Sequence, residues 1–159
     1  LEVFSRQTGE AFRVLISGYA DRIDLYDGVL RILDYKTGYV DPKEVTIAEI
    51  EQINDLKSAA KIIQLLMYAV MLKGNPKFAT NKSRIQSGII SLRMPSKYVI
   101  PAEAGGSNEL SNDTLNLFES FLEEKLAEIF NEDIDFVQTD DAEKCKLCDF
   151  AGFCNRISL

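Results

Sequence analysis

The sequence has 159 residues, 46% of them hydrophobic, and a formal net charge of −7. This length supports one domain with a buried core and is too short for two, so we expect a single domain over residues 1–159. No apolar run approaches the ~20 residues of a membrane span, and no signal-peptide pattern opens the chain, which favours a soluble cytoplasmic protein without a membrane partner. The acidic balance disfavours a free-standing DNA-binding protein, because phosphate contacts need clustered Lys and Arg.

The first predicted element is a β-hairpin with strands at about 11–26 and 29–36. Asp27 and Gly28 stand between alternating apolar residues. An Asp-Gly pair in this setting is the strongest short signal for a two-residue turn, because glycine accepts the positive φ that such a turn requires.

The register of this hairpin brings two carboxylates together. With the turn at residues 27 and 28, Ile23 lies opposite Ile32 and Asp21 lies opposite Asp34. Opposed side chains are about 4.5–5.5 Å apart at Cβ, and two like charges there destabilise a sheet unless a cation lies between them. Mg²⁺ prefers one or two carboxylates with water and phosphate, and Lys36 shares their face. The group therefore predicts metal-assisted phosphodiester hydrolysis, with Mg²⁺ or Mn²⁺ held by the two aspartates.

Two plainer interpretations stand beside this one. Asp21 and Asp34 as solvated carboxylates at a sheet edge would need no metal, although this leaves Lys36 and an acidic pair inside apolar strands unexplained. Asp24 faces the opposite side of the sheet, where the register places it across from Arg31. For Asp24 we therefore expect a structural ion pair and no metal role.

Residues 39–57 are polar, with Ile47, Ile50 and Ile53 at threefold spacing. This pattern predicts a loop with a short helix that carries little core and forms a rim or insertion, part of it disordered.

A stronger helix is expected over residues 59–73, with Ser58 as its N-cap and Gly74 at its end. Most of its surface is apolar, so it should pack deeply against the sheet. Gln64 and Tyr68 are four residues apart and lie on one face. On a buried helix they are either site residues or simply polar groups with satisfied hydrogen bonds.

The second half of the chain predicts a third strand at 85–92, a loop or disordered link at 98–106, and a helix at about 113–130. Ser111 precedes this helix as a cap. Its apolar residues recur at helical spacing, so we expect the helix to pack against the sheet.

All three cysteines fall within residues 140–159, as Cys145, Cys148 and Cys154 in a C-x₂-C-x₅-C cluster. Spacing this tight in a protein of intracellular type favours metal ligation over a disulfide. Three thiolates leave a four-coordinate site one ligand short, and the chain has no His to complete it. The missing ligand must then lie outside this chain. The alternative is a tail of free, reduced thiols.

Two blocks of the hairpin also resemble a known family. Residues 18–24 and 32–38 resemble the GxxDRxD and DYKTG motifs of the PD-(D/E)XK nuclease superfamily, in particular its RecB-like branch and the C-terminal nuclease domain of AddB-type helicase–nuclease subunits. The residues Gln64 and Tyr68 resemble the QxxxY motif of that branch. The resemblance covers roughly residues 18–154.

The resemblance implies a restriction-endonuclease-like α/β fold, with a central, mostly antiparallel or mixed sheet flanked by helices. It implies a Mg²⁺-dependent DNA nuclease of exonuclease type in recombination and repair, with Asp21 and Asp34 on the metal and Lys36 as a catalytic residue. Gln64 and Tyr68 would lie at the rim of the site.

The cysteine triad resembles the one that binds a four-iron four-sulfur cluster together with a distant upstream Cys. That Cys and the upstream histidine motif of the family are missing here. Since the chain starts at Leu1, we expect a fragment of a longer protein, partnered by DNA, the rest of its parent chain and a helicase–nuclease subunit. Alone it should bind no cluster and be a weak nuclease. The alternative from another class is a non-catalytic DNA-end-binding or scaffold domain that keeps the fold.

Overall fold

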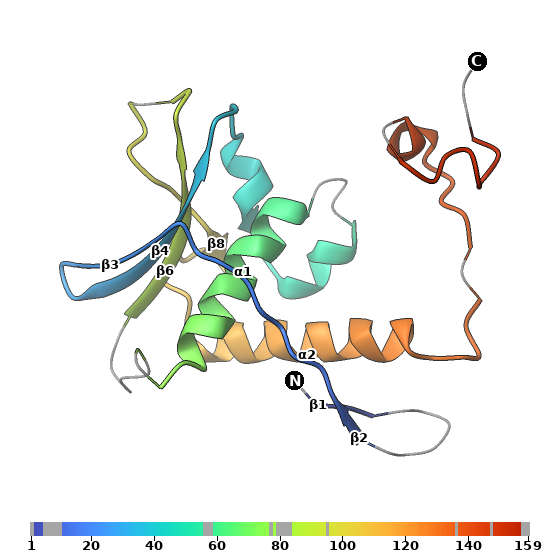
Figure 1. Ribbon diagram of the computed structural model, residues 1–159. Coiled ribbons are helices and arrows are strands. Elements are labelled where there is room, and N and C mark those ends of the chain that lie inside the picture. The colour runs from blue at the N-terminus through green and yellow to red at the C-terminus, as the bar shows by residue number, and fades with distance from the viewer. Residues whose placement is uncertain are drawn as a thin grey trace.

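The computed structural model describes residues 2–4, 11–55, 59–76, 78, 84–94, 96–135, 137–146 and 148–156. Four strands form a mixed sheet in the order β3-β4-β6-β7, with helices beside it (Figure 1). The expected α/β class with a central sheet flanked by helices is confirmed. The bounds are Arg22–Tyr26 for β3, Val29–Lys36 for β4, Arg84–Ser91 for β6, Ile100–Pro101 for β7, Ala60–Lys73 for α1 and Asn112–Ile129 for α2.

The hairpin of β3 and β4 forms as predicted. Asp27 and Gly28 both have positive φ, at 51° and 74°, as a two-residue turn of the mirror-image type requires. Antiparallel pairs run from Tyr26 with Val29 to Arg22 with Leu33, which confirms the expected register within the strands. The predicted pair of Asp21 with Asp34 would lie one step beyond the last pair of this ladder.

The expected strand over 11–26 is wrong, because it is interrupted. Residues 11–13 form β2 (Ala11–Arg13), which pairs with β1 (Glu2–Phe4) in a separate two-stranded sheet. Residues 14–21 are not in a strand, and β3 begins only at Arg22. The partner explains the break: β4 ends at Lys36, so it offers no backbone groups against which residues 11–17 could continue the ladder.

The central strand β4 pairs in parallel with β6 on its other side, and β6 pairs antiparallel with β7. The crossover between β4 and β6 contains α1, as parallel neighbours require. Side chains of β4, α1 and α2 form one buried core, which includes Leu30, Ile32, Leu65, Leu66, Leu115 and Phe118.

Helix α1 matches its prediction closely and ends at Gly74, whose N–H caps the last turn. Its buried residues recur along one side as Ile62, Leu65, Leu66, Ala69 and Leu72. The position before the helix is Ala59, which makes no side-chain cap. The predicted cap, Ser58, lies outside the described residues.

The segment from 39 to 55 contributes core, contrary to expectation. It forms two 3₁₀ helices, η1 (Pro42–Val45) and η2 (Ile50–Asp55), around strand β5 (Thr46–Ile47). Its buried side chains are Val40, Val45, Ile47, Ile50 and Ile53. Each such side chain stabilises the fold by up to about 1.5–3 kcal/mol, so the segment is part of the folded body.

Residues 98–106 are likewise more ordered than predicted. They contain β7 and strand β8 (Glu103–Ala104), which pairs in parallel with β5. Ile100, Ala102 and Ala104 are buried, and this burial explains why the segment is not a loose link.

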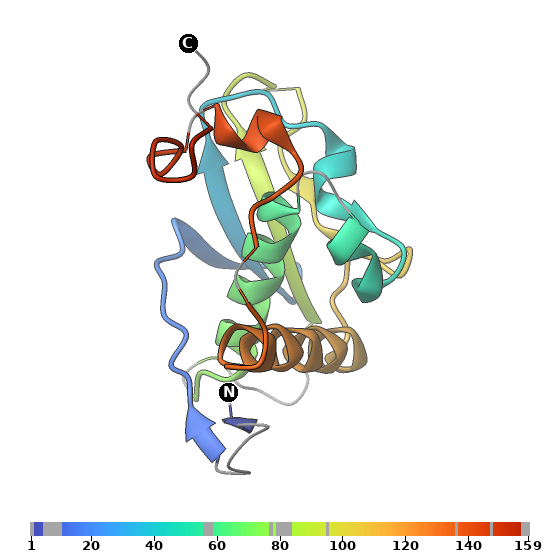
Figure 2. The same cartoon turned by 90° about the vertical axis from the view of Figure 1, so that its right-hand side faces the viewer.

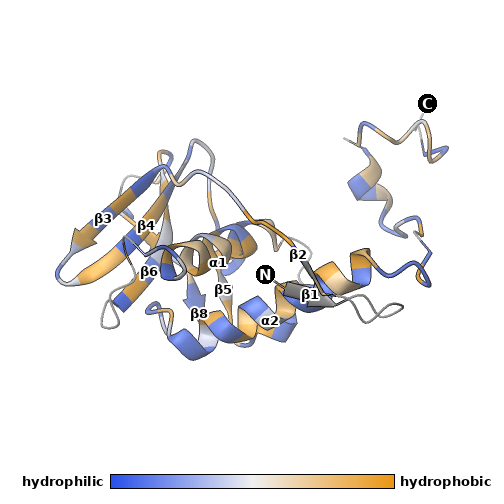
Figure 3. Cartoon of the chain, turned by 60° about the horizontal axis from the view of Figure 1, so that its bottom comes forward, coloured by the Kyte–Doolittle hydropathy of each residue, from blue (hydrophilic) through white to orange (hydrophobic). Residues whose placement is uncertain are grey.

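Helix α2 begins after Ser111, whose hydroxyl accepts from the backbone N–H of Thr114 as predicted. Its backbone lies nearest to α1, η2 and β1, and its buried Leu115 and Phe118 join the core that also contains Leu30 and Ile32 of the sheet. These two buried residues lie in the first half of the helix. Phe121 and Leu122 are partly buried against the core, and Ile129 at the end of the helix is 58% exposed. Hydrophobic and hydrophilic residues alternate along its surface (Figure 3).

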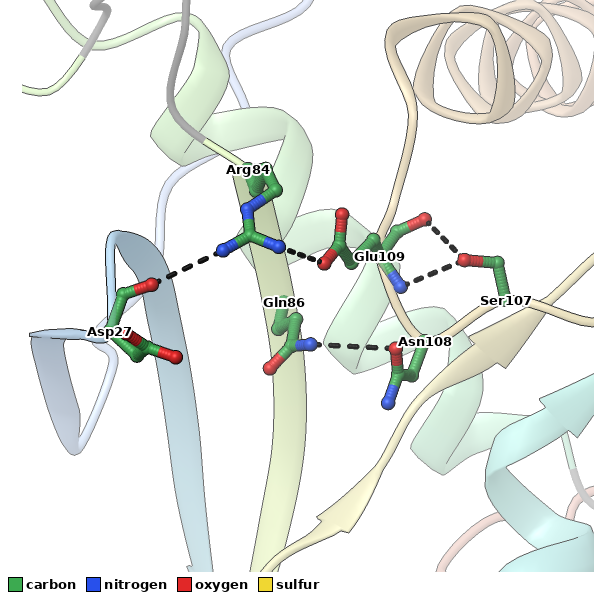
Figure 4. Close-up of polar contacts among 6 residues, drawn as sticks. All are labelled: Asp27, Arg84, Gln86, Ser107, Asn108 and Glu109. Atoms are coloured by element: carbon green, nitrogen blue, oxygen red, sulfur yellow. Dashed lines mark hydrogen bonds and ion pairs between the residues drawn. The ribbon is translucent and has the colours of Figure 1, made fainter.

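The turn end of the sheet is tied to the segment before α2 (Figure 4). Arg84 donates to the carbonyl oxygen of Asp27 at 3.2 Å and pairs with Glu109 at 2.8 Å. Gln86 donates to Asn108 at 3.4 Å. These contacts hold the hairpin at the end opposite Asp34 and Lys36.

After α2 the chain leaves the rest of the molecule (Figures 1 and 2). The described part of this tail closes on itself, since Gln138 donates to the carbonyl of Cys154 at 2.9 Å and Arg156 donates to that of Thr139 at 3.3 Å. Among the described residues, no helix has the length and apolar character needed to cross a membrane.

Candidate active site

The site is built on the end of β4. Asp34 and Lys36 are two residues apart and therefore point to the same face, the one that α1 covers. The Asp34 side chain is buried, and the Lys36 side chain is 32% exposed. Lys36 Nζ lies 2.8 Å from Asp34 Oδ2 in an ion pair, although this oxygen accepts no hydrogen bond from the described residues.

Helix α1 adds Gln64 and Tyr68 to this pair. The Gln64 amide oxygen accepts from Lys36 Nζ at 3.1 Å, and its Nε2 donates to Asp34 Oδ1 at 3.2 Å and to Tyr68 Oη at 2.9 Å. One amide thus holds the ammonium and the carboxylate together. The structure brings these four predicted site residues into a single hydrogen-bonded group.

Asp21 immediately precedes β3, and its side chain reaches the backbone of Tyr35 in β4. Its Oδ2 accepts a hydrogen bond from the backbone N–H of Tyr35 at 2.8 Å. The regular ladder ends at Arg22 with Leu33, so the carboxylate takes the place of a strand carbonyl. Asp21 is exposed, and its bond to Tyr35 places it at the end of β4 that also carries Asp34 and Lys36.

Asp24 faces away from this group, as predicted. It forms a two-pronged ion pair with Arg31, at 2.7 and 3.0 Å, and a second ion pair with Arg22. The hydrogen bond from Arg31, with help from Arg22, holds the pKa of Asp24 below its usual value against the opposing effect of burial. The predicted ion pair of Asp24 with Arg31 is confirmed.

A permanent positive charge lies on the outer face near the site. Hydrogen bonds to the side chains of Tyr35 and Tyr98, and then to Asp24, raise the pKa of Arg22 above its ordinary value. Tyr35 and Tyr98 are 43% and 63% exposed. These tyrosines were not among the predicted site residues, because their proximity depends on a loop more than sixty residues away.

Two supporting contacts were not predicted from the sequence. Ser91, at the end of β6, is buried and donates from its hydroxyl to the carbonyl of Gly38 at 2.8 Å. The backbone N–H of Leu92 donates to the carbonyl of Lys36 at 2.9 Å. Both contacts fix the chain at and just after the end of β4. The only signal in the sequence was a serine at the end of an alternating strand.

Asp21 and Asp34 are the residues with the chemistry to hold a divalent cation. Mg²⁺ takes one or two carboxylates and completes its shell with water and phosphate. The buried Asp34 oxygen that accepts no hydrogen bond has a lone pair available for such an ion. Among the described residues, no three His, Cys, Asp or Glu side chains are grouped so as to enclose a metal.

The cysteines lie in the tail, far from this group (Figure 1). Cys145 ends the 3₁₀ helix η3 (Ala142–Cys145), and the N–H of Cys148 donates to its carbonyl at 3.2 Å. All three thiols are free, and within the described residues they do not form a metal-ligand group. The arrangement does not fit an iron–sulfur cluster as it stands, and the predicted ligation stays a prediction.

Comparison with models of protein families gives a match that agrees with the fold. The model of the PD-(D/E)XK nuclease superfamily matches residues 2–155. Comparison with curated proteins gives no match, and neither does comparison with solved structures. The mixed sheet flanked by helices is consistent with a restriction-endonuclease-like fold. With nearly its whole length matched, the chain belongs to the PD-(D/E)XK nuclease superfamily.

Proposed function

We propose that this chain is a Mg²⁺-dependent DNA nuclease, in which Asp21 and Asp34 hold the metal and Lys36 is a catalytic residue. The observation that carries the proposal is the position of Asp34. Its carboxylate is buried, and the Lys36 ammonium and the Gln64 amide both lie against it. Burying a charge is costly unless it is paired, and such a group at the open end of a strand is typical of a reactive site.

Each protein side chain has a distinct task in this proposal. Lys36, held by Asp34 and Gln64, presents its ammonium to a phosphate oxygen or to the attacking water. Gln64 keeps this ammonium in place, and Tyr68 keeps the Gln64 amide in place. A bound Mg²⁺ would supply charge to polarise the phosphate and lower the pKa of a water.

The acidic net charge bears on how DNA reaches the site. At −7 the chain lacks the broad basic surface that binds phosphates. Lys36 at the end of β4 and Arg22 at the start of β3 supply positive charge locally, on opposite faces of the same end of the hairpin. We propose that DNA is delivered by other parts of an AddB-type helicase–nuclease of the RecB-like branch, acting as an exonuclease in repair and recombination. The support for this finer assignment is the two hairpin motifs and the pair Gln64 and Tyr68.

The cysteine triad gives a further, separate part of the proposal. We propose that Cys145, Cys148 and Cys154 are three ligands of a four-iron four-sulfur cluster whose fourth ligand comes from outside this chain. Binding would then require the tail to rearrange. This proposal is tested by measuring iron and acid-labile sulfide in this chain and in the longer parent protein, both prepared anaerobically. We expect iron and sulfide only in the parent, and we expect Cys148→Ala to remove them. A parent without iron would contradict it.

The nuclease proposal is tested by matched amide substitutions on one hairpin. A labelled oligonucleotide is incubated with the protein in Mg²⁺, in Mn²⁺ and in EDTA. We expect cleavage that needs the metal and falls at least about 100-fold in Asp34→Asn and Asp21→Asn. Asp27→Asn makes the same chemical change at the turn, where Asn accepts a positive φ, and should cleave as the wild type does.

The rival function is a scaffold that binds DNA ends without cutting them. It predicts no binding of Mn²⁺ to the wild-type protein, measured by electron paramagnetic resonance. The nuclease proposal predicts binding that Asp34→Asn removes. Equal cleavage by Asp34→Asn and the wild type would take Asp34 out of the site.

A further inference from the structure

An open, mostly apolar pocket lies directly beside the candidate active site. Its volume is about 160 Å³. Its walls come from the segment before β3, from both hairpin strands and from α1, and include Gly18, Ala20, Ile23, Ile32, Tyr68 and Met71. Gly18 is exposed and Ile23 is 40% exposed, so the pocket opens to solvent on that side.

The walls of the pocket continue into the site. Ala20 immediately precedes Asp21, and Ile32 is two residues before Asp34 on the same face of β4. Tyr68 belongs to both, since its ring lines the pocket and its hydroxyl accepts from Gln64 at 2.9 Å. A ligand with its charged end at Lys36 therefore has the pocket within reach of its other end.

The chemistry of the candidate active site and that of the pocket together indicate which ligand could bind across both. Lys36 and the metal ligands suit an anionic group, whereas the pocket suits a flat, uncharged ring that can lie against Tyr68. A dry cavity of about 150 Å³ holds one benzene ring, so this pocket can surround a single six-membered ring, whereas the second ring of a fused pair would extend into solvent. A phosphate joined to a single-ring heterocycle is a pyrimidine nucleotide.

We propose that this pocket binds the pyrimidine base of the nucleotide adjoining the scissile phosphate. The inference rests on the proposed nuclease function and adds a specificity determinant to it. A base can enter the pocket only when it is unstacked from its neighbours. The pocket therefore makes the site select for an unpaired pyrimidine beside the bond to be cut.

The binding step is tested with methionine methyl groups as reporters. The chain has three Met residues. Met71 lines this pocket and also a second hollow, Met67 lines only the second hollow of the two, and Met94 lies elsewhere against the core. A shift of Met71 without a shift of Met67 therefore reports on this pocket. Thymidine 5′-monophosphate has no phosphodiester to hydrolyse. In Mg²⁺ it should shift the Met71 methyl resonance saturably and leave the other two unchanged. Deoxyribose 5-phosphate, which lacks the base, should not shift it, and deoxyadenosine 5′-monophosphate should bind several-fold more weakly.

Substitutions at Gly18 give a graded control for this experiment. A Cβ at this position would lie 3.7 Å from Met71 Cε and 3.8 Å from Tyr68 Cε1, which is ordinary contact. Gly18→Ala should therefore keep the Met71 response. Gly18→Leu places further atoms at the pocket mouth and should abolish it. An unmoved Met71 methyl in the wild type, or an unchanged response in a folded Gly18→Leu, overturns the proposal.

A cleavage assay separates this proposal from the function on which it rests. Replacing the base beside the cut by an abasic site should slow wild-type cleavage roughly ten-fold or more, since one stacked base contributes about this much. Gly18→Leu should cut both substrates at one rate. If the cleavage rate does not depend on the base and the Met71 resonance does not shift, the proposal for the pocket is refuted and the proposed nuclease function still stands. A Met71 response without any cleavage would refute the nuclease and leave the pocket.

Discussion

Replacing Gln64 by leucine should weaken both the fold and the site, because its amide joins Lys36, Asp34 and Tyr68. The bond to Asp34 matters most for stability. Lys36 is partly exposed and can turn to water, whereas Asp34 Oδ1 would lose a donor within a buried region. A hydrogen bond to a charged group contributes about 1.5–3 kcal/mol, and the length of 3.2 Å favours the lower part of that range.

The remaining contributions bring the expected loss to about 2–3 kcal/mol. The neutral bond to Tyr68 adds about 1 kcal/mol, and partial burial of the new leucine offsets a comparable amount or less. Urea unfolding in EDTA, followed by circular dichroism, should show a midpoint about 1 M lower. Tyr68→Phe removes only the hydroxyl and should cost about 1 kcal/mol.

Gln86→Leu is the matched control for Gln64→Leu. Gln86 is also half-buried, but among the described residues its side chain makes a single, neutral hydrogen bond of 3.4 Å, to Asn108 at the far end of the sheet (Figure 4). This change should cost less than about 1 kcal/mol and leave cleavage unchanged. Gln64→Leu should lower kcat/KM about 10–100-fold, as loss of a supporting contact does. If Gln64→Leu unfolds at the wild-type midpoint, the amide does not join these groups in solution.

Three further changes test the packing that supports the site, each by urea unfolding. Ser87→Ala should be neutral or stabilising, because the Ser87 hydroxyl is buried without a hydrogen-bond partner among the described residues; a loss above about 1 kcal/mol would reveal a missing partner. Gly88→Ala should destabilise by at least about 1–3 kcal/mol, because its Cβ would lie 2.9 Å from the Ile100 carbonyl oxygen; wild-type stability would show that β7 can shift away. The lowered pKa of Asp24 contributes stability that is complete above the usual carboxyl pKa of about 3.9 and is lost as the pH falls through the lower folded value. Asp24→Asn should therefore reduce stability at neutral pH and progressively less in acid, and an equal reduction at every pH would contradict the ion pair with Arg31.

Local chemistry along the chain was enough to predict the hairpin and the face that carries the site. The positive φ of Asp27 and Gly28 set the turn, and the turn set the register. Because side chains alternate along a strand, Asp34 and Lys36 had to share a face whatever else the chain did. The C-terminal end of α1 at Gly74 and the cap of α2 at Ser111 were predictable for the same reason: short-range sterics and hydrogen bonds decide them.

Tertiary contacts decided where strands stop and which polar segments are buried. The strand predicted over 11–26 breaks because its partner β4 ends at Lys36, and no local signal marks that point. Ile47, Ile50 and Ile53 looked like a rim, yet they fill the core because β5 finds a partner in β8, more than fifty residues away.

The assembly of the site shows the same division. Sequence spacing placed Gln64 and Tyr68 on one helix face but left open whether that face meets β4. Only the packing of α1 on the sheet brings the Gln64 amide to Lys36 and Asp34, 28 and 30 residues earlier in the chain. The chemistry of each side chain follows from the sequence alone. Their proximity depends on the burial of apolar surface between segments that are far apart in the chain, and no short stretch of sequence shows this.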